Sequence, residues 1–284
     1  MKVKILDDFD LYKIAYSGQC FRVKEVLNSD KAGAYQFITG EHLLYICPVT
    51  GEDNVYSVSC SENEWADVWY DYFDLNTSYE EIRESIPTSD AFLTKAAQIG
   101  KGIRILKQDK FEMLISFIIS QRKSIPAIKS SVEKLCKLFG APITPSSGVN
   151  DASVIYTFPT YEQLIKASDT ELGECGLGYR VPYIIDAVKR VNTRNLDLTS
   201  LDNLSDDDLL EALKSVYGVG DKVANCVALF AYHRIGLSPI DTWIKKVIET
   251  EYKGNDPFGQ YPKTAGIMQQ YMFFASQHEK ILSK

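Results

Sequence analysis

The chain has 284 residues, of which 45% are hydrophobic and 24% charged, close to the composition of an ordinary globular protein. A chain of this length can bury a sizeable core without metals or disulfides, so a small disulfide-stapled scaffold is excluded. The formal net charge of −7 argues against a broad basic surface, and any contact with nucleic acid is therefore expected to be local.

The cysteines and the apolar segments exclude further classes of protein. The six cysteines, at positions 20, 47, 60, 136, 175 and 226, form no CxxC pair and no tight metal-ligand spacing, so we interpret them as reduced thiols. The chain has no run of about 20 apolar residues for a membrane span, and its start, MKVKILDDFD, has no apolar secretion segment. We expect no membrane partner and a location inside the cell: cytoplasm or nucleoid in a prokaryote, nucleus in a eukaryote.

The first sixty residues are predicted to form strands. The segments AYQFITG, HLLYICPV and VYSVSC are rich in Tyr, Ile and Val, and turn residues separate them, which is typical of an antiparallel meander. From Ser61 the pattern becomes helical. An aromatic stretch around Trp65 and Trp69 leads into NTSYEEIRESI, where Thr77 or Ser78 can cap a helix.

The rest of the chain is predicted to be helical. Residues 111–121 are apolar enough for a buried helix, and Pro126 lies in the first turn of the next helix, which Gly140 ends. Further helices are expected at residues 160–167, 181–191 and 205–216, and an exposed polar connection at 191–203. Strands followed by helices predict an α+β fold, with an N-terminal antiparallel β-sheet subdomain over residues 1–88 and an all-helical domain over residues 89–284.

The most informative segment is residues 207–249, which is predicted to form a helix, a tight turn and a second helix. Gly218-Val219-Gly220 ends the first helix with residues that can take positive φ, and the second helix begins near Lys222. Backbone N–H groups at such a helix start bind a phosphate without side-chain charge. The negative net charge therefore does not exclude DNA binding.

Two side chains beside this turn are candidates for chemistry. Lys222 lies in the first turn of its helix, where the helix dipole disfavours a cation, and a nucleophilic lysine must act as the neutral amine. Asp241 follows Ser238-Pro239-Ile240 and opens the next helix, from which its carboxylate can face the lysine. Each has an ordinary alternative, because a first-turn lysine is more often solvated and an aspartate at a helix start is more often a cap.

Five segments in order resemble the helix-hairpin-helix (HhH-GPD) DNA glycosylases, specifically the Ogg-type 8-oxoguanine DNA glycosylase/lyases. GVGDKVANC with the later PID is similar to the hairpin, catalytic lysine and aspartate loop of that superfamily. The other segments are SGQCFR, YFDL, GLGYR and QQYMFFA, at 17–22, 72–75, 176–180 and 269–275. The resemblance implies a helical HhH-GPD glycosylase domain after the sheet, and a DNA N-glycosylase with AP (apurinic/apyrimidinic) lyase activity that excises 8-oxoguanine from double-stranded DNA in base excision repair.

The resemblance also implies the roles of the two candidate catalytic residues. The amine of Lys222 is expected to attack C1′ of a flipped nucleotide, to displace the base and to form a Schiff base, after which β-elimination nicks the 3′ side. Asp241 is expected to orient or deprotonate this amine and to stabilise positive charge on the sugar.

A base pocket follows from the same resemblance. Cys226, one helical turn after the lysine, would cover one face of the flipped base; Phe273, one turn after Gln269, would cover the other while the Gln269 amide contacts the Watson–Crick edge. The carbonyl of Gly18 would accept the N7–H that only the oxidised base carries. The alternatives are core packing for Phe273, with Phe274 as a rival for the same role, and an ordinary turn for Gly18.

The resemblance implies DNA contacts by the hairpin and by two other segments, namely by Gly218, Gly220, Gln121, Arg122, Tyr179 and Arg180. Gln121 and Arg122 are expected to fill the gap that the flipped nucleotide leaves, and Arg180 to hold the opposite strand. A site for a monovalent cation, Na⁺ or K⁺, is expected at backbone carbonyls of the hairpin, those of Lys214, Val216 and Val219. No other cofactor is expected to be required, and we expect a monomer.

The chain departs from the family's pattern at two positions. Ala127 stands where mammalian-type members carry an arginine that reads the orphaned cytosine, so a weak opposite-base preference is expected. Trp243 replaces the family's phosphate-contacting histidine, so some of the affinity for DNA must come from other residues. A local basic strip is the candidate source, made of Lys245, Lys246, Arg122, Lys123 and Lys129.

Three other functions are open from the sequence alone. A glycosylase for another damaged purine, such as an alkylated one, commonly lacks the lysine. A non-catalytic helix-hairpin-helix module that only binds DNA would not require Lys222 together with Asp241. An unrelated lysine Schiff-base enzyme for a small carbonyl compound would not need duplex DNA.

Overall fold

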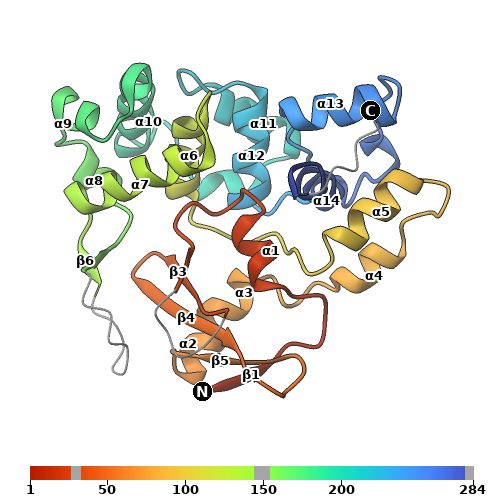
Figure 1. Cartoon of the computed structure of the whole chain (residues 1–284). Helices are drawn as coiled ribbons and strands as arrows, with labels where there is room; N and C mark the ends of the chain where they lie inside the picture. Colours follow the sequence, from red (N-terminus) through yellow and green to blue (C-terminus); the bar gives the residue numbers. More distant parts are fainter. Residues whose placement is uncertain (27–32, 144–153, 279–284) are drawn as a thin grey trace.

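The structure, a computed structural model, describes residues 1–26, 33–143 and 154–278. One antiparallel sheet has five strands in the order β1 (Lys2–Lys4), β5 (Val55–Val58), β4 (His42–Pro48), β3 (Tyr35–Thr39) and β2 (Lys24–Glu25). This sheet forms one end of the molecule, and the helices from α6 onward form the other (Figure 1). The predicted α+β class is confirmed, as are the three predicted strands that became β3, β4 and β5.

The prediction of strands throughout the first sixty residues is wrong for one segment, because α1 (Leu11–Tyr16) is a helix. Asp10 caps it, since its carboxylate accepts the backbone N–H of Lys13 at 3.1 Å. Leu11 and Ile14 then bury against the sheet. The helix delivers the chain directly into the SGQ turn at residues 17–19.

Short helices follow the sheet. They are α2 (Glu62–Glu64), the π-helix η1 (Trp65–Trp69), α3 (Tyr70–Tyr72), α4 (Tyr79–Glu84) and α5 (Ala91–Ile99). The remaining elements are α6 (Lys110–Ser120), α7 (Ile125–Phe139), β6 (Pro142–Ile143), β7 (Ile155–Tyr156), α8 (Tyr161–Leu164), α9 (Asp169–Glu174), η2 (Gly178–Arg180), α10 (Val181–Asn192), η3 (Ser200–Asn203), α11 (Asp206–Lys214), α12 (Asp221–Ala231), α13 (Thr242–Glu251), η4 (Phe258–Gln260) and α14 (Ala265–His278). The predicted helices are present within a few residues of their expected bounds.

Residues 191–203 are not the exposed connection that their polarity predicts. Leu196, Leu198 and Leu201 are buried, while the residues between them face solvent. The carbonyl of Leu198 also accepts the hydroxyl of Tyr232 at 3.0 Å. The segment is therefore packed onto the helical core through every second or third residue, a spacing that its many polar residues conceal.

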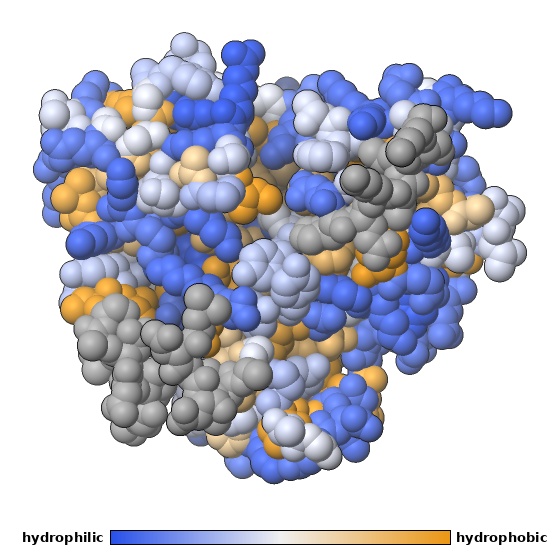
Figure 2. Space-filling model, in the orientation of Figure 1, coloured by the Kyte–Doolittle hydropathy of each residue, from blue (hydrophilic) through white to orange (hydrophobic). Residues whose placement is uncertain are grey.

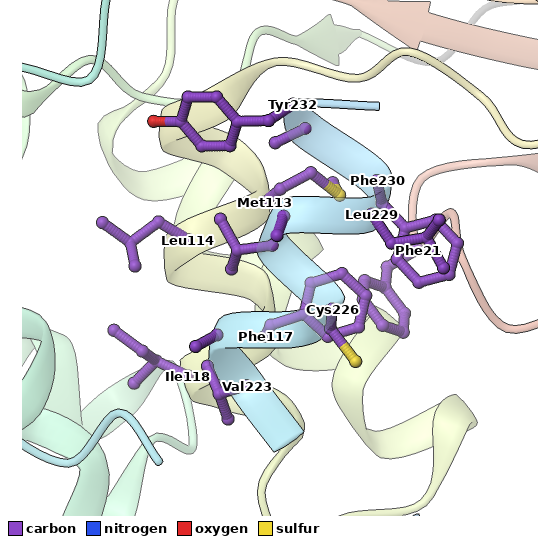
Figure 3. Close-up of a cluster of buried hydrophobic side chains, with 14 of the residues drawn as sticks. Phe21, Met113, Leu114, Phe117, Ile118, Val223, Cys226, Leu229, Phe230 and Tyr232 are labelled. Carbon is purple, nitrogen blue, oxygen red and sulfur yellow. The ribbon is translucent and has the colours of Figure 1, made fainter. Parts of the chain in front are cut away.

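Helices α6 and α12 pack together in the core of the helical part (Figure 3). Phe117 of α6 stacks on Phe230 of α12 with ring centroids 5.5 Å apart, and Cys226 belongs to the same buried cluster. Phe21, from the N-terminal part, joins this cluster edge-on to Phe117 at 5.4 Å. Conversely, Leu106 packs into the core of the sheet, so the two parts share residues between their cores.

A fully buried arginine joins the segments that surround the sheet. Arg104 donates to the carbonyls of Phe73 at 2.9 Å and Asp8 at 2.8 Å, and to the carboxylate of Asp7 at 2.8 Å. Because these acceptors come from distant segments, the single guanidinium fixes the position of the chain that follows it, residues 104–108. This segment in turn holds the SGQ turn.

The surface gives little sign of a large apolar patch on the side in view. The face shown in Figure 2 is mostly hydrophilic, with apolar residues scattered among polar ones. Within the described ranges, no helix is both long and apolar enough to span a bilayer.

A buried carboxyl on α6 makes the stability of the fold depend on pH. Glu112 is 4% exposed, and burial raises the pKa of its carboxyl from 4.5 to about 7, although the nearby Arg22 guanidinium acts in the opposite direction. The folded protein thus holds this proton more tightly than the unfolded chain. Its stabilising contribution is complete below pH 4.5 and is lost as the pH rises through about 7.

We expect Glu112→Gln to remove this dependence. Between pH 5 and pH 8 the free energy of unfolding should fall by about 2 kcal/mol more in the wild type than in the variant. One unit of difference between the folded and unfolded pKa values corresponds to about 1.4 kcal/mol. Urea unfolding at the two pH values measures this. The exposed Glu174→Gln is the control, and equal pH profiles for wild type and Glu112→Gln would contradict the prediction.

Candidate active site

A cavity of about 730 Å³ lies where the predicted site residues meet. Its walls come from the SGQ turn, the end of α6 with the turn that follows, and the starts of α12 and α13, together with α14. The predicted residues that line it are Gly18, Gln121, Arg122, Lys222, Asp241 and Phe273. Segments that are distant in the sequence therefore meet at one cavity.

Lys222 is the second residue of α12, in the first turn, as predicted. It is half-buried, and its ammonium lies 5.2 Å from the centroid of the Phe117 ring. The neighbouring carboxylate of Asp221 pairs with Lys214 at 3.0 Å rather than with Lys222. The Lys222 side chain is therefore supported by an aromatic ring and lines the cavity.

Asp241 is the N-cap of α13, and its Oδ1 accepts the backbone N–H of Ile244 at 2.9 Å. The capping role is thus present, yet the same carboxylate also lines the cavity. A carboxylate has lone pairs beyond the one that capping uses. Asp241 can therefore cap the helix and still act on a group in the cavity.

The thiol of Cys226 is close enough to both charged groups for each to affect its pKa. Burial raises the pKa of this thiol, the positive charge of Lys222 lowers it and the carboxylate of Asp241 raises it. The net direction is upward, so Cys226 is an uncharged thiol at pH 7 and a poor nucleophile. Of the two side chains, the lysine is the one suited to attack.

In the SGQ turn, the backbone of Gly18 lies against the aromatic ring of Phe273. Gly18 has φ +78, and a Cβ there would lie 2.9 Å from Cε1 of Phe273, so this position requires glycine. Gln19 anchors the turn: its Nε2 donates to the carbonyl of Arg104 and its Oε1 accepts the N–H of Leu106, both at 2.8 Å. The structure brings together Gly18 and Phe273, which are predicted to contact the N7 edge and one face of a bound base.

Two other predicted pocket residues lie deeper. Cys226 and Gln269 are both about 3% exposed and are not part of the cavity wall. Gln269 accepts the side-chain amide of Gln270 at 2.9 Å, whereas Phe273, one turn later on α14, reaches the cavity. Phe274 is buried in the core, so Phe273 has the more suitable position. Contact of Cys226 or Gln269 with a base stays a prediction.

The hairpin between α11 and α12 requires one of its two glycines. Gly218 has φ +81, and a Cβ there would lie 2.4 Å from the ring of Tyr183. Gly220 has an extended conformation with open space beside it, and it begins α12 without a side-chain cap. Because no described side chain occupies the first-turn N–H groups of α12, they are available to an anion.

The segments with Gln121 and Arg180 form a second wall beside the cavity. Arg122 is exposed and has φ +50. Arg180 does not extend toward solvent: it is 6% exposed, and its Nε donates to the carbonyl of Gln121 at 3.0 Å and its Nη1 to that of Leu177 at 3.2 Å. Tyr179 is exposed, with the Arg180 guanidinium 4.4 Å from its ring centroid. A contact of Arg180 with a DNA strand stays a prediction, since this guanidinium is engaged within the protein.

The expected basic strip is smaller than its sequence indicates. The ammonium groups of Lys123 and Lys129 donate to protein oxygens, and burial lowers the pKa of both lysines. Lys245 and Lys246 are exposed, and Lys245 lines the cavity. Trp243 is 42% exposed and lines the cavity as well.

Several residues of the cavity wall were not identified as site residues from the sequence, among them Phe117 of α6 and Gln277 of α14. Phe117 lies one helical turn before Gln121, and Gln277 lies one turn after Phe273. In both cases the i, i+4 spacing from a predicted residue was a usable signal. The sequence contained no such signal for which residues would face Phe117 and Gln277 across the cavity.

Family models match two adjacent parts of the chain. Residues 3–114 match the model described as 8-oxoguanine DNA glycosylase, N-terminal domain, and residues 115–261 match that of the HhH-GPD superfamily base excision DNA repair protein.

Similar proteins and structures agree with these models. The chain is 36% identical over 195 residues to the N-glycosylase/DNA lyase of Saccharomyces cerevisiae, covering 64% of this chain and 50% of that protein. It is 30% identical over 240 residues to the N-glycosylase/DNA lyase OGG1 of Arabidopsis thaliana, covering 81% of this chain and 63% of the relative. The match thus spans only part of both relatives. The Clostridium acetobutylicum 8-oxoguanine glycosylase/lyase in complex with dsDNA containing cytosine opposite 8-oxoG superposes with a TM-score of 0.88 at 31% identity, covering 99% of each chain.

Proposed function

Because this chain belongs to the HhH-GPD superfamily of base excision DNA repair proteins and carries the N-terminal domain of 8-oxoguanine DNA glycosylases, we propose that it is a bifunctional glycosylase/AP lyase for 8-oxoguanine in duplex DNA. One observation carries the proposal. Lys222, in the first turn of α12 and without the neighbouring Asp221 carboxylate as partner, lines the same cavity as Asp241. A nucleophilic amine and a carboxylate in one cavity suit attack at a sugar carbon.

The proposed chemistry uses these two groups in sequence. Asp241 accepts a proton from the ammonium of Lys222, and the freed amine attacks C1′ as the bond from C1′ to the base breaks. The base leaves with a proton, and the sugar opens to a Schiff base on the lysine. Loss of a C2′ proton then expels the 3′ phosphate by β-elimination, which nicks the strand. When the Asp241 carboxyl passes its proton to the departing base, it becomes a carboxylate again and stabilises positive charge on the sugar.

Recognition of the lesion is assigned to the SGQ turn and α14. The Gly18 carbonyl is proposed to accept the N7–H of 8-oxoguanine and to repel the N7 lone pair of guanine. The hydrogen bonds of Gln19 support this role, because they hold the turn in place. Phe273, in contact with Gly18, would stack on one face of the base, and Cys226 would lie against the other.

A weak preference for the opposite base is part of the proposal. Ala127 has only a methyl group where mammalian-type members have an arginine, and a methyl group cannot donate to a base edge. The guanidinium of Arg180 is held by carbonyls of the protein itself. The arginine that reads the orphaned cytosine is therefore absent here, and the arginine expected to hold the opposite strand is engaged within the protein.

A Na⁺ or K⁺ ion at the hairpin is also proposed, and no organic cofactor. The carbonyl of Val216 accepts the N–H of Val219 at 3.0 Å, which leaves a second lone pair for an ion. With the carbonyls of Lys214 and Val219 it offers neutral oxygen ligands, the kind that suit a hard cation. Such an ion would stabilise the hairpin next to a DNA phosphate.

Borohydride trapping tests the proposed function. A labelled duplex with one central 8-oxoguanine should yield a covalent adduct with the protein, and an undamaged duplex should not. Base release without an adduct would favour a water-based glycosylase. If neither occurs while the duplex still binds, the protein is a DNA-binding module.

The recognition role of Gly18 makes a separate prediction. Gly18→Ala strains a residue at φ +78 and forces the Phe273 ring away by a few tenths of an ångström. We expect single-turnover excision of 8-oxoguanine to slow by roughly tenfold or more, because the base pocket loses its geometry. The free energy of unfolding should fall by about 1 to 3 kcal/mol.

Gly40→Ala is the matched control for this substitution. Gly40 has φ +54 in the turn between β3 and β4, and a Cβ there meets no atom within 4 Å. It should lose similar stability through backbone strain and keep its excision rate. Equal effects of the two substitutions on excision would show that Gly18 acts only through stability.

A further inference from the structure

Two positively charged side chains connect the segments that form the second wall of the cavity, because each donates hydrogen bonds to the other segment. Lys123, in the turn after α6, donates from Nζ to the carbonyl of Gly176 at 2.7 Å. Arg180, in the segment that begins at Gly176, donates from Nε and Nη2 to the carbonyl of Gln121. Each segment thus supplies a cation to the main chain of the other. We call these two interactions the reciprocal clamp.

The cations of the reciprocal clamp are held in an environment that disfavours charge. Arg180 is 6% exposed, and burial followed by the positive charge of Arg180 lowers the pKa of Lys123. Their hydrogen-bond acceptors are neutral oxygens, including the Ser131 hydroxyl at 2.5 Å from Lys123. Among the described residues the two like charges have no acidic partner, and their mutual repulsion offsets part of the stability that their hydrogen bonds contribute.

The residue between the two clamped positions is Arg122. It has φ +50, a conformation that non-glycine residues rarely adopt, and its side chain is exposed at the cavity. The clamp fixes the residue before it, Gln121, through a carbonyl and the residue after it, Lys123, through an ammonium. Both ends of a strained residue are therefore held.

We propose that Arg180 and Lys123 are positioning residues that hold Arg122 ready to enter the gap left by a flipped nucleotide, and that Arg180 does not read the opposite base. The proposal rests on the proposed function. It assigns to Arg180 a role through the main chain of Gln121 rather than a direct contact with DNA.

The proposal predicts an effect that does not depend on the opposite base. Arg180→Met and Lys123→Met should each slow single-turnover excision of 8-oxoguanine by about tenfold or more, by the same factor opposite C, A, G and T. Arg180→Lys should restore part of the rate, because an ammonium can still donate to the Gln121 carbonyl. A changed ranking of opposite bases in Arg180→Met would overturn the proposal and make Arg180 a reader of the base.

A double-substitution cycle separates positioning from general loss of stability. If Arg180 acts through Arg122, then Arg122→Ala combined with Arg180→Met should be no slower than Arg122→Ala alone. Additive effects of the two substitutions would contradict the clamp. Urea unfolding of each variant shows whether it is folded under the assay conditions.

A binding measurement tests the clamp without any chemistry. Arg122 entering a gap should change the fluorescence of 2-aminopurine placed opposite a tetrahydrofuran abasic site, and Arg180→Met should reduce that change several-fold. This fluorescence measurement distinguishes failure of the clamp from failure of the proposed function. If the wild type excises nothing but gives the fluorescence change, only the proposed function fails; if Arg180→Met keeps the full change, the clamp is wrong.

Discussion

Lys222→Gln is expected to give no borohydride-trapped adduct and to excise 8-oxoguanine at least about a thousandfold more slowly than the wild type. The reason is that glutamine has no amine that can form the Schiff base, while it keeps a similar length and helix propensity. The lysine contacts the ring of Phe117, an interaction worth about 0.5 to 1 kcal/mol, so the variant should remain folded. Trapping gels and single-turnover kinetics measure the two losses.

A second lysine in the cavity wall provides the contrary test. Lys245, on α13, is exposed, lines the same cavity and lies four residues after Asp241 in the chain. If Lys222→Gln still gives the adduct and Lys245→Gln does not, the nucleophile is Lys245. The assignment of Lys222 would then be wrong even though the proposed activity is right.

Asp241→Asn is expected to lower excision by about a hundredfold to a thousandfold with little change in stability. Asparagine caps a helix about as well as aspartate, so the bond to the Ile244 N–H is kept and only the negative charge is lost. The rate falls because nothing takes the proton from Lys222 or offsets positive charge on the sugar. Urea unfolding and single-turnover excision on the same preparation separate the two effects.

The neighbouring carboxylate of Asp221 serves as the control. It lies next to Lys222 in the chain but is exposed and pairs with Lys214. Asp221→Asn should therefore keep its excision rate within a few-fold, although it removes the same charge from the first turn of α12. Full activity in Asp241→Asn would show that the carboxylate of Asp241 has no chemical role. An equal loss in Asp221→Asn would show that the loss comes from removing any negative charge near Lys222.

The parts of the site that depend on local sequence were predictable. Gly218, with φ +81, marks the turn, and the helical spacing after it places Lys222 in the first turn of α12. Asp241 occupies the helix start expected for it. Caps, glycines and i, i+4 spacing act over a few residues, so their signals survive in a single sequence.

The parts that depend on distant main-chain atoms were not predictable. Arg180 is buried because it binds the carbonyl of Gln121, 59 residues earlier in the chain. Every residue has a carbonyl, so such an acceptor leaves no mark in the sequence. The same holds for Gln19, whose partners are main-chain atoms of Arg104 and Leu106. Even α1 was missed, because its main local signal is the single cap at Asp10.

The distribution of tryptophans gives the protein a built-in optical signal. Of its three tryptophans, Trp65 and Trp69 are 8% and 0% exposed, whereas Trp243 stands 42% exposed in the cavity wall. A soluble quencher such as acrylamide will therefore reach one indole and spare the other two. Shielding of that emission by an unlabelled duplex would report occupancy of the cavity in real time, without a fluorophore on either molecule.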